Sequence, residues 1–570
     1  MTWQVMPTFD GYEEARESFE WDLPDEFNPA VDFLRKHDDP SRTALRYEPP
    51  DSDGGEGGDG GGALETYSFE GLDDASDRLA AALAGLGVEP GDRVGVVVPQ
   101  KPQNPITHLA NWKVGAVSVP LTVLFGRDAL EYRLEDSGAK AVVVDPSVRE
   151  TVDEIRGACP DLERVIELGD WESVTGVDEE RGGATTHAFA DLLEEHDPGF
   201  DVYDSTPETP TAIMYTSGST GPPKGVLHSH ALWLGRAAAA YNYFDQGLAE
   251  GEATLWTPAD WAWGAALGGT LFAAWHHGCT IVGWPREGFD PEDAYDLVER
   301  HGVTKAFMPP TALRMLMSVD DPEGEYDLAL ETLASAGEPL TPEVVEWVEE
   351  TFEDVAINDF YGQTELNLVV GNADSWFETR PGSMGKPFPG YEVAVLDPET
   401  REELGPGEVG ELAVKPGDRR VFFDEYWGLP EKTAAKRTEN GWFLTDDLVE
   451  RDEDGYCWFV SRADDVILTS GYRVGPMEVE KAILHHEDVE QAGVVGVPDE
   501  TRGEAIKAFV QPATDDYDPE TLRAEIRDLV RDRLAEYEYP KHVAFVDELP
   551  TTSTGKIRRL SLRERERAAE

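Results

Sequence analysis

A stretch rich in serine, threonine and glycine follows a buried strand and constrains the fold more than any other part of the chain. The short apolar run 211–215 is typical of a buried strand. Residues 215–226 then read Tyr-Thr-Ser-Gly-Ser-Thr-Gly-Pro-Pro-Lys-Gly-Val. Glycines let backbone N–H groups face an anion, hydroxyls add donors, and a lysine adds a positive charge. The pattern predicts a polyphosphate-binding loop between this strand and a helix that Ser229 caps and that runs through 232–240.

Two glycine-rich segments look like known nucleotide loops but depart from them. In the first, Lys224 follows Pro223 and precedes Gly225, whereas a Walker A loop has glycine before its lysine and serine or threonine after it. By composition alone, a flexible surface loop is the alternative there. In the second, residues 51–62 contain a G-x-G-x-x-G pattern with no helix after it. We expect a disordered hairpin tip at that point, not a dinucleotide site.

The net charge is the most unusual property of the composition. The 570 residues include 48 lysines and arginines against 115 aspartates and glutamates, for a formal charge of −67. The acidic residues are spread along the whole chain. Such a spread is typical of proteins from a salt-saturated cytoplasm, where screening suppresses self-repulsion; an ordinary acidic enzyme is the alternative. So much negative charge argues against nucleic acid and anionic membranes as partners.

The sequence favours a cytoplasmic location. No apolar run reaches the roughly 18 residues of a membrane helix, and the first residues lack the basic and apolar regions of a secretory signal. Cys159, Cys279 and Cys457 lie far apart, without the spacing of a metal site or a disulfide framework.

Short β-prone runs alternate with helical patterns along most of the chain. Residues 44–47 and 65–69 are predicted to pair as strands, and 72–86 are predicted to form an amphipathic helix. Residues 93–98 and 141–144 are predicted to be buried strands. This alternation indicates an α/β fold built of layers with parallel sheets.

The pattern changes near residue 464, where a small α+β unit is predicted to begin. Its expected elements are a helix at 478–485, strands at 493–497 and 508–510, a helix at 519–536 and a strand at 543–546. We therefore expect two domains, residues 1–463 and residues 464–570. The short polar stretch 461–465 between them could act as a hinge for a mobile small domain.

Several motifs resemble, in the right order, those of the adenylate-forming superfamily, which includes acyl-CoA synthetases, peptide-synthetase adenylation domains and luciferases. Residues 215–226 resemble its phosphate loop, and Phe-Tyr-Gly-Gln-Thr-Glu at 360–365 resembles its nucleotide segment. Further matches are Ser-Ala-Gly-Glu-Pro at 335–339, Gly-Trp-Phe-Leu-Thr-Asp-Asp at 441–447, Ser-Gly-Tyr-Arg-Val-Gly-Pro at 470–476 and Thr-Gly-Lys at 554–556. The motif at 470–476 has the form found in medium-chain acyl-CoA synthetases. The resemblance covers nearly the whole chain.

The resemblance implies roles for individual residues. The implied catalytic residues are Lys556, Lys224 and Glu365, with Glu365 as the Mg²⁺ ligand. The implied ATP- and AMP-binding residues are Thr216, Ser217, Gly218, Ser219, Thr220, Gly221, Lys224, Gly337, Glu338, Pro339, Asp359, Tyr361, Gln363, Thr364, Asp447, Arg462, Arg473 and Lys556. The implied acyl pocket contains Trp263, Gly264, Ala336 and Gly362; the implied CoA residues are Gly471, Tyr472 and Arg531; and the implied hinge is Asp464.

The side-chain chemistry fits several of these roles. Glu365 is a hard oxygen donor suited to Mg²⁺ on phosphates, and Tyr361 offers a flat face to adenine. Taken alone, Glu365 is better explained as a solvated loop residue and Tyr361 as a core residue. Lys556 alone is better explained as part of a surface turn. In the ribose-binding motif, Asp446 replaces the usual glycine before Asp447. A turn there that needs positive φ suits aspartate better than most residues.

The resemblance further implies an acyl-CoA synthetase that uses ATP, Mg²⁺ and CoA in two steps. A carboxylate first attacks the α-phosphate of ATP to give acyl-adenylate and pyrophosphate, and the CoA thiol then displaces AMP. Lys556, Lys224 and Mg²⁺ would stabilise the charge in the first step. A swing about Asp464 would then withdraw Lys556 and bring Gly471 to the site.

The choice of acid is the least determined part of this interpretation. Acetate-specific relatives have tryptophan directly before Gln-Thr-Glu, where this chain has Gly362, so we expect an open acyl channel beside Tyr361. Apolar residues 261–265 would form its opposite wall, which favours a medium-chain fatty or aromatic acid. The alternatives are an acetate or propionate ligase, an enzyme that loads a carrier protein, and a non-catalytic nucleotide-binding protein. Whether the protein forms a homodimer is left open.

Overall fold

The computed structural model describes residues 3–50, 64–169, 180–181, 184–216, 222–286, 288–337, 340–462, 465–469, 472–499, 503–514, 517–534, 538–551 and 556–569. The glycine-rich pattern at 51–62 lies outside the described residues. Contacts divide the chain into a larger unit, Met1–Glu392 with Lys415–Arg437, and a smaller unit, Val393–Val414 with Thr438–Glu570.

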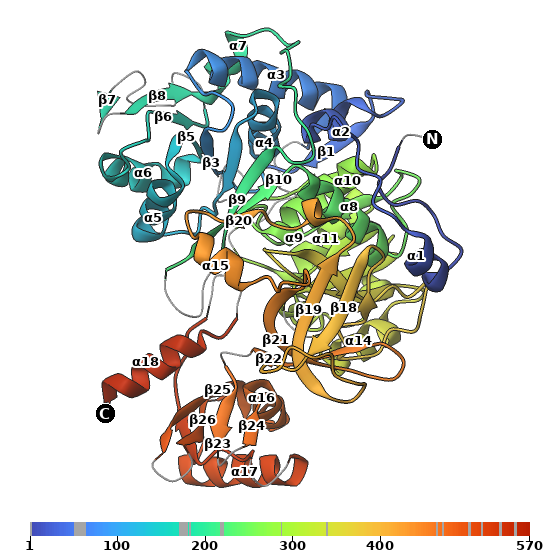
Figure 1. The fold of residues 1–570 in the computed structure, drawn as a ribbon, viewed down its shortest axis with the longest axis vertical. Helices are drawn as coiled ribbons and strands as arrows, with labels where there is room; N and C mark the ends of the chain where they lie inside the picture. The colour runs from blue at the N-terminus through green and yellow to red at the C-terminus, as the bar shows by residue number, and fades with distance from the viewer. Residues whose placement is uncertain are drawn as a thin grey trace. The chain divides into compact units, whose positions relative to one another are not determined.

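The first sheet of the larger unit is mostly parallel, with antiparallel strands at both ends. In spatial order its strands are β20 (Glu425–Tyr426), β10 (Lys224–Ser229), β9 (Pro210–Thr216), β4 (Val117–Pro120), β3 (Arg93–Val97), β5 (Ala139–Val144), β6 (Arg164–Glu167), β8 (Ala184–Ala188) and β7 (Glu180–Arg181). Its helices are α3 (Phe69–Gly85), α4 (Gln103–Val114), α5 (Arg127–Ser137), α6 (Arg149–Ile155) and α7 (Phe189–Glu194). In Figure 1, α3 and α4 lie together on one side of these strands, and α5 and α6 lie together on the other.

The second sheet of the larger unit is parallel in its middle and carries antiparallel strands at its ends. Its order is β17 (Lys386–Pro387), β16 (Asn367–Gly371), β15 (Ala356–Gln363), β14 (Thr332–Ala336), β13 (Lys305–Phe307), β11 (Thr254–Trp256), β12 (Thr280–Gly283), β1 (Thr43–Tyr47) and β2 (Glu65–Ser68). The remaining helices of this unit are α1 (Tyr12–Ser18), α2 (Pro29–Arg35), α8 (Ala231–Tyr243), α9 (Gly264–Ala266), α10 (Ala273–His276), α11 (Pro291–His301), α12 (Pro310–Leu316), α13 (Pro322–Glu325), α14 (Pro342–Thr351) and α15 (Pro430–Ala435). A π-helical turn, Leu267–Phe272, joins α9 to α10.

The smaller unit contains two sheets. One is the antiparallel set β18 (Tyr391–Leu396), β19 (Val409–Pro416), β21 (Phe443–Arg451) and β22 (Cys457–Arg462). The other runs β24 (Tyr472–Val474), β23 (Ile467–Thr469), β26 (Gly503–Pro512) and β25 (Val489–Asp499), with β27 (His542–Phe545) also paired to β26. Its helices are α16 (Pro476–Leu484), α17 (Pro519–Arg533) and α18 (Arg559–Ala569).

The predicted α/β class is confirmed. The predicted strands at 93–98 and 141–144 are β3 and β5, which lie side by side and parallel, and the predicted strand pair near residues 45 and 67 is the antiparallel pair of β1 and β2. The elements expected after residue 476 are also present. A division into domains at residue 463 stays a prediction.

The prediction for the chain after the phosphate-loop stretch is wrong in one respect. A strand, not a helix, comes next: β10 is antiparallel to β9, and Lys224 pairs with Thr216. β9 and β10 are therefore antiparallel neighbours in the sheet, with residues 217–223 between them in the chain. Ser229 therefore ends a strand, and α8 begins at Ala231 without a side-chain cap.

Helix α8 is buried along its whole length, from Ala231 to Tyr243. A run of four alanines lets it pack closely between neighbouring elements, and Arg236 is its only charged residue. A helix that is apolar all round is either a core helix or a membrane span. In the part of the chain that the structure describes, no helix is long and apolar enough to cross a membrane.

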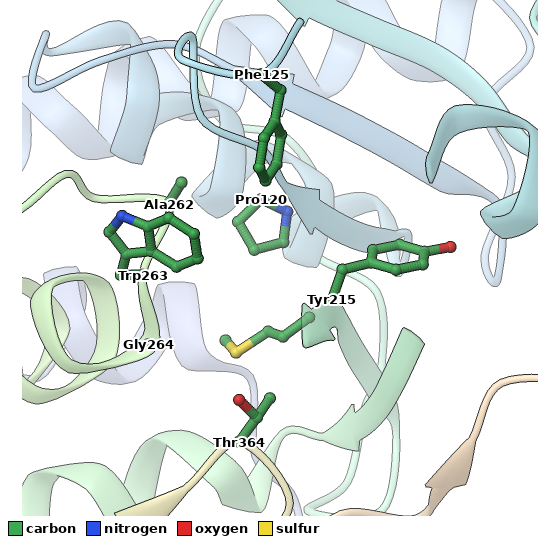
Figure 2. A pocket seen from close by; sticks show the side chains of 8 residues that line it. Pro120, Phe125, Tyr215, Ala262, Trp263, Gly264 and Thr364 are labelled. Atoms are coloured by element: carbon green, nitrogen blue, oxygen red, sulfur yellow. The ribbon is translucent and has the colours of Figure 1, made fainter. Parts of the chain in front are cut away.

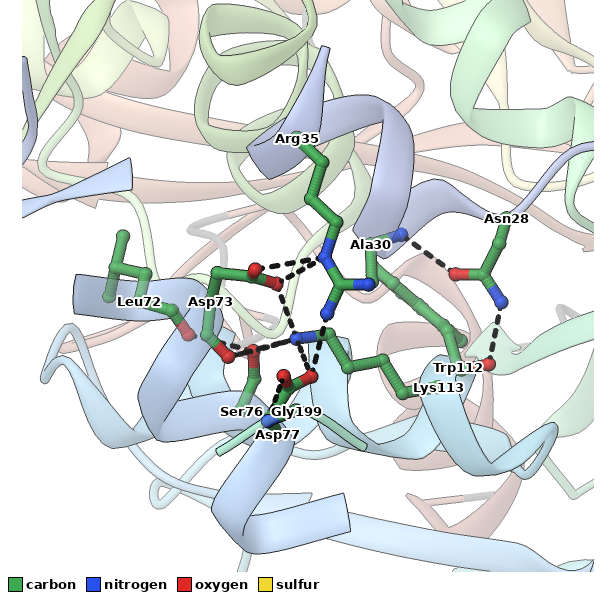
Figure 3. A network of polar contacts seen from close by, with 10 residues as sticks. All are labelled: Asn28, Ala30, Arg35, Leu72, Asp73, Ser76, Asp77, Trp112, Lys113 and Gly199. Atoms are coloured by element: carbon green, nitrogen blue, oxygen red, sulfur yellow. Dashed lines mark hydrogen bonds and ion pairs between the residues drawn. The ribbon is translucent and has the colours of Figure 1, made fainter. Parts of the chain in front are cut away.

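A buried cluster of charges ties α2, α3 and α4 together (Figure 3). The fully buried Lys113 Nζ lies 2.6 Å from Asp73 Oδ1, 2.7 Å from Asp77 Oδ1 and 2.8 Å from Ser76 Oγ. Arg35 forms ion pairs with the same two aspartates. Burial of an ammonium group is tolerable here because carboxylates surround it.

Candidate functional site

Two of the predicted catalytic residues meet at a tyrosine of the larger unit. The buried Glu365 lies in the turn between β15 and β16, and its Oε1 accepts a hydrogen bond of 2.6 Å from the Tyr426 hydroxyl. Lys224, the first residue of β10, places its Nζ 4.5 Å from the centre of the Tyr426 ring. Sequence reasoning missed Tyr426. The residue arrives through the antiparallel pairing of β10 with β20, in which Val226 faces Tyr426.

The predicted nucleotide segment lies on two adjacent parallel strands. Asp359, Tyr361 and Gln363 belong to β15, and Ala336 ends β14, where it pairs with Phe360. Gly337 follows Ala336 with φ +99°, a left-handed conformation that glycine adopts without strain. The described parts of these two predicted nucleotide-binding segments are thus neighbours in one sheet. Glu338 and Pro339 lie outside the described residues, as do Ser217, Gly218, Ser219, Thr220 and Gly221.

Asp359 is a buried carboxyl group at the edge of this segment. Burial raises its pKa to about 7, and the Asn372 amide, which donates a hydrogen bond to Oδ1, opposes that shift. Loss of hydration penalises the charged form, so the group is close to half protonated at neutral pH. Asp359 can therefore accept or donate a hydrogen bond to a ligand.

The structure gives Gly362 a backbone explanation, and its expected role as the open end of an acyl channel stays a prediction. A Cβ at position 362 would lie 2.0 Å from the Asn367 carbonyl oxygen and 2.9 Å from the Leu368 Cα. Both contacts are to the backbone of the neighbouring strand β16, at an irregular point in its pairing with β15. A side chain here would break the strand pair, so Gly362 is explained by close backbone approach.

A pocket nevertheless opens beside the predicted acyl wall (Figure 2). It is lined by Pro120, Phe125, Met214, Tyr215, Ala262, Trp263, Gly264 and Thr364. Trp263 and Gly264 were predicted to line an acyl pocket, and Thr364 to face the nucleotide. Gly362 and Ala336 are not among these lining residues.

The pocket wall contains residues that sequence reasoning missed. Phe125 and Trp263 face each other edge to face, with ring centres 6.3 Å apart. Met214 and Tyr215 lie near the end of β9, where the phosphate-loop stretch begins, and Pro120 ends the neighbouring strand β4. The carboxyl ends of parallel strands meet at one edge of a sheet, where ligands bind in open α/β folds. The position of these residues at strand ends could therefore have indicated that they line a pocket.

In the smaller unit, the predicted ribose-binding pair is present on adjacent strands. Asp447 of β21 pairs with Arg462 of β22, and Asp447 Oδ1 lies 3.7 Å from Arg462 Nη1. Asp446 has φ +60°, a left-handed conformation in which glycine would be more comfortable but which aspartate tolerates better than most residues. The Asp446 N–H donates to Glu411 Oε1 at 3.1 Å, which helps to hold the turn.

The other predicted residues of the smaller unit are only partly described. Tyr472 and Arg473 lie in β24, antiparallel to β23. Arg531 lies in the last turn of α17, with its guanidinium 4.1 Å from the Tyr539 ring centre. Lys556 is exposed and directly precedes Ile557, which pairs with Thr551. Gly471 and Asp464 lie outside the described residues.

Among the described residues, no three histidine, cysteine or acidic side chains lie close enough together to hold a metal ion. Glu365 is thus a single carboxylate with one hydrogen-bond donor beside it. The three cysteines are free and buried, and burial raises the pKa of each thiol. None of them is suited to act as a nucleophile.

Comparisons with known proteins match almost the whole chain. The AMP-binding enzyme family matches residues 35–424, and the AMP-binding enzyme C-terminal domain matches residues 478–556. The acetyl-coenzyme A synthetase of Bacillus subtilis is 35% identical over 595 residues, covering 99% of this chain and 97% of that protein. A mitochondrial acyl-coenzyme A synthetase of Rattus norvegicus is 33% identical over 569 residues, covering 99% of this chain and 94% of that protein.

The same relationship holds for solved structures. An anthranilate CoA ligase in complex with anthranoyl-AMP has a TM-score of 0.83 at 27% identity, covering 96% of this chain and 99% of that one. The motifs, the fold and the matches along both units agree, and the chain belongs to the AMP-binding enzyme family of adenylate-forming acyl-CoA synthetases.

Proposed function

We propose that this AMP-forming acid–CoA ligase activates a carboxylic acid of medium chain length or with an aromatic ring. The observation that carries the proposal is the pocket beside Trp263, whose wall is built from Phe125, Pro120, Met214 and Ala262. Apolar and aromatic walls favour an acyl part that gains from leaving water.

The reaction has two steps that conserve atoms and charge. A carboxylate oxygen attacks the α-phosphorus of ATP, the bond to the β-phosphate oxygen breaks, and pyrophosphate leaves. The sulfur of CoA then attacks the acyl carbon, and AMP leaves with the carboxylate oxygen. Both ATP and CoA are substrates of acyl-CoA synthetases as a class.

In the larger unit, we assign Lys224 and Glu365 to the phosphates. Lys224 lies at the mouth of the hairpin whose tip carries the hydroxyl- and glycine-rich stretch. A lysine at this position neutralises phosphate charge, which is what phosphoryl-type chemistry mostly requires. Tyr426 keeps the Glu365 carboxylate in one orientation through its hydroxyl, and its ring supports the lysine.

Glu365 also fits the requirement of Mg²⁺. This ion takes one or two protein carboxylates and completes its shell with water and substrate phosphates. A buried glutamate with one carboxylate oxygen held by Tyr426 meets that requirement without a larger cluster. When bound, the ion would neutralise phosphate charge.

In the smaller unit, we assign Asp447 and Arg462 to the ribose of the nucleotide and Lys556 to the charge that develops at the α-phosphate. The Asp447 carboxylate is buried while Arg462 is partly exposed, so the pair can hold a ligand hydroxyl from both sides. A mobile small domain that begins at residue 464 would let Lys556 act in the first step alone.

Three further assignments are proposals of the same kind. The acidic composition supports a salt-rich cytoplasm as the working environment. Three free, buried cysteines fit a reducing compartment. A homodimer is the oligomer we would test first, because two-fold dimers are the commonest assemblies.

The proposed function is tested by pyrophosphate release from ATP with a panel of acids from acetate to decanoate plus benzoate, at high salt, with and without CoA. We expect the highest kcat/KM for hexanoate, octanoate or benzoate, and thioester formation that depends on CoA. A maximum at acetate or propionate would contradict the substrate assignment. Pyrophosphate release without thioester would favour a carrier-loading enzyme, and no turnover with any acid would favour a nucleotide-binding protein.

The Lys556→Ala variant tests the division of labour between the two steps. We expect adenylation to fall by at least about a thousandfold, because the lysine acts only where phosphate charge develops. Conversion of supplied acyl-adenylate and CoA to thioester should continue. The Arg558→Ala variant, which removes a neighbouring exposed charge, is the matched control. An equal loss in both half-reactions would contradict the assignment.

A further inference from the structure

Arg236 is a buried cation for which the described residues provide no carboxylate counter-ion. It lies in the middle of α8, and only 3% of its surface is exposed. Within the described part of the chain, its Nε has no hydrogen-bond partner. The charged and titratable groups that act on it are the hydroxyls of Tyr243 and Tyr391, without a carboxylate.

Burial of an unpaired guanidinium is unfavourable, and this group remains charged. Burial lowers the pKa of Arg236 to about 10, which leaves it protonated at neutral pH. The same charge contributes to the low pKa of the neighbouring buried His228. The Tyr243 hydroxyl is already used, since it donates to the Gly269 carbonyl at 2.5 Å. A retained buried charge without a partner marks a position where a ligand can supply one.

Arg236 also lies directly behind the wall of the pocket. A Cβ at Gly264, which lines the pocket, would lie 3.1 Å from Arg236 Nη2, 3.5 Å from Cζ and 3.6 Å from Nη1. Arg236 is itself buried and is not among the pocket-lining residues, and the glycine at position 264 places no side chain between this face of the guanidinium and the pocket wall. Figure 2 shows Gly264 beside Trp263 on the same side of the pocket.

A second glycine leaves room for the stem of the arginine. A Cβ at Gly268 would lie 3.1 Å from Arg236 Cγ and 3.1 Å from the Trp233 ring. The stem thus passes between Trp233 and the π-helical turn, which fixes the direction of the guanidinium. Such a fixed fork matches a carboxylate in a two-point contact.

We propose that Arg236 determines substrate specificity by binding a second carboxylate at the far end of the acid, so that the preferred substrates are dicarboxylic acids activated at one end. The proposal rests on the proposed function and narrows it, because the aliphatic or aromatic middle of the acid would still contact the apolar wall. The distal carboxylate is a spectator: it neutralises the guanidinium, while the other carboxylate attacks ATP as described above.

A neutral acyl end fits this site less well. A methyl group or an unsubstituted ring would leave the guanidinium buried and uncompensated under the substrate. A carboxylate offers the opposite charge and two acceptors, and charge-assisted hydrogen bonds are the stronger kind. The diacid thus compensates a charge that has no carboxylate partner among the residues that the structure describes.

The test compares acids in matched pairs of equal length: hexanoate with adipate, octanoate with suberate, and benzoate with terephthalate. The measurement is kcat/KM from pyrophosphate release for the wild type, Arg236→Met and Arg236→Lys at high salt. We expect the wild type to prefer the diacid in at least one pair by about tenfold or more. Arg236→Met should lower the diacid-to-monoacid ratio by about 10- to 100-fold, mainly through KM, which corresponds to one charged contact. Arg236→Lys should retain part of the preference.

A second variant leaves the arginine in place. Gly264→Ala puts a methyl group 3.1 Å from Nη2, so it should lower the same ratio by covering the guanidinium. Thermal unfolding of each variant establishes that it is folded, and if Arg236→Met fails to fold, Arg236→Lys and Gly264→Ala carry the test.

A wild type that prefers the monoacid in every pair would overturn the proposal. An unchanged ratio in Arg236→Met or, failing that, in both other variants would do the same. Activity with monoacids alone would leave the ligase function intact and defeat only this inference. Absence of pyrophosphate release with every acid would instead overturn the proposed function.

Discussion

Two buried cations of the larger unit, Lys113 and Arg236, have opposite surroundings. Lys113 is enclosed by Asp73, Asp77 and Ser76, all within 2.9 Å of its Nζ, and is fully buried (Figure 3). Arg236 is buried to nearly the same extent, among aromatic rings, glycines and alanines.

The difference separates structural from functional charge. A buried ion pair contributes to stability only when each group compensates the other, and loss of one partner leaves a charge in a medium of low dielectric constant. Lys113 has such partners in the cluster that joins α2, α3 and α4. Arg236 has no such partner in the described residues, so a ligand can neutralise its charge.

The largest expected effect concerns the exposed charges, which differ from both buried cations by being screened. With a formal charge of −67, we expect the protein to lose its fold and its activity below about 0.5 M salt, because the screening length grows as salt falls. Circular dichroism and pyrophosphate release across a KCl series would measure this. Full activity in low-salt buffer without divalent ions or osmolytes would contradict it.

The next effect tests the compensated cation. Lys113→Met should lower the free energy of unfolding by about 3–5 kcal/mol, because it leaves Asp73 and Asp77 close together with only the partly exposed Arg35 as a partner. Chemical denaturation at high salt measures the change. The control is Lys140→Met, whose ion pair with Asp92 is partly exposed and should contribute about 0–1 kcal/mol. Equal effects of the two variants would show that the cluster is not special.

Much of the fold could be predicted from local sequence. The strands near residues 93, 141 and 211 are short apolar runs, and the motifs at 360–365 and 441–447 follow recognisable strands. Even the positive φ of Asp446 follows from its place in a motif that usually has glycine. These features depend on neighbours in the chain, which a sequence pattern records.

The features that the sequence did not reveal are mostly set by other segments. The contact between Tyr426 and Glu365 depends on the pairing of β20 with β10, which are about 200 residues apart in the chain, whereas β10 itself returns against the nearby strand β9. At Gly362, the backbone of the next strand leaves no room for a side chain. The sequence does single out Arg236, because it is the only charged residue in an otherwise uncharged helix. The sequence does not show whether an acidic side chain lies beside it in the fold.

Asp359 extends the comparison to a buried acid with no cation beside it. Its pKa rises from 3.8 to about 7 on folding, so its protonated form is preferred in the folded state. The stabilising contribution is complete below about pH 4 and is lost as the pH rises to about 7. Asp359→Asn should remove this pH dependence, with a difference of up to about 4 kcal/mol between pH 4 and pH 7 for a shift of three pKa units. Parallel unfolding curves of wild type and variant against pH would contradict the assignment.

The smallest expected effect is the most informative about Arg236. Replacement of Lys113 removes one member of a compensated cluster, whereas Arg236→Met removes a charge that has no partner to leave behind. A methionine fills a similar volume with a flexible apolar chain, and the desolvation penalty of the guanidinium disappears. We therefore expect the substrate-free variant to be as stable as the wild type or more stable, by about 0–2 kcal/mol. A small cavity would oppose this gain, so a decrease of more than about 2 kcal/mol would mean that Arg236 supports the fold. The measurement is thermal and chemical unfolding at high salt without substrate, and addition of adipate should stabilise the wild type while leaving Arg236→Met unchanged, because binding to the folded state alone raises apparent stability.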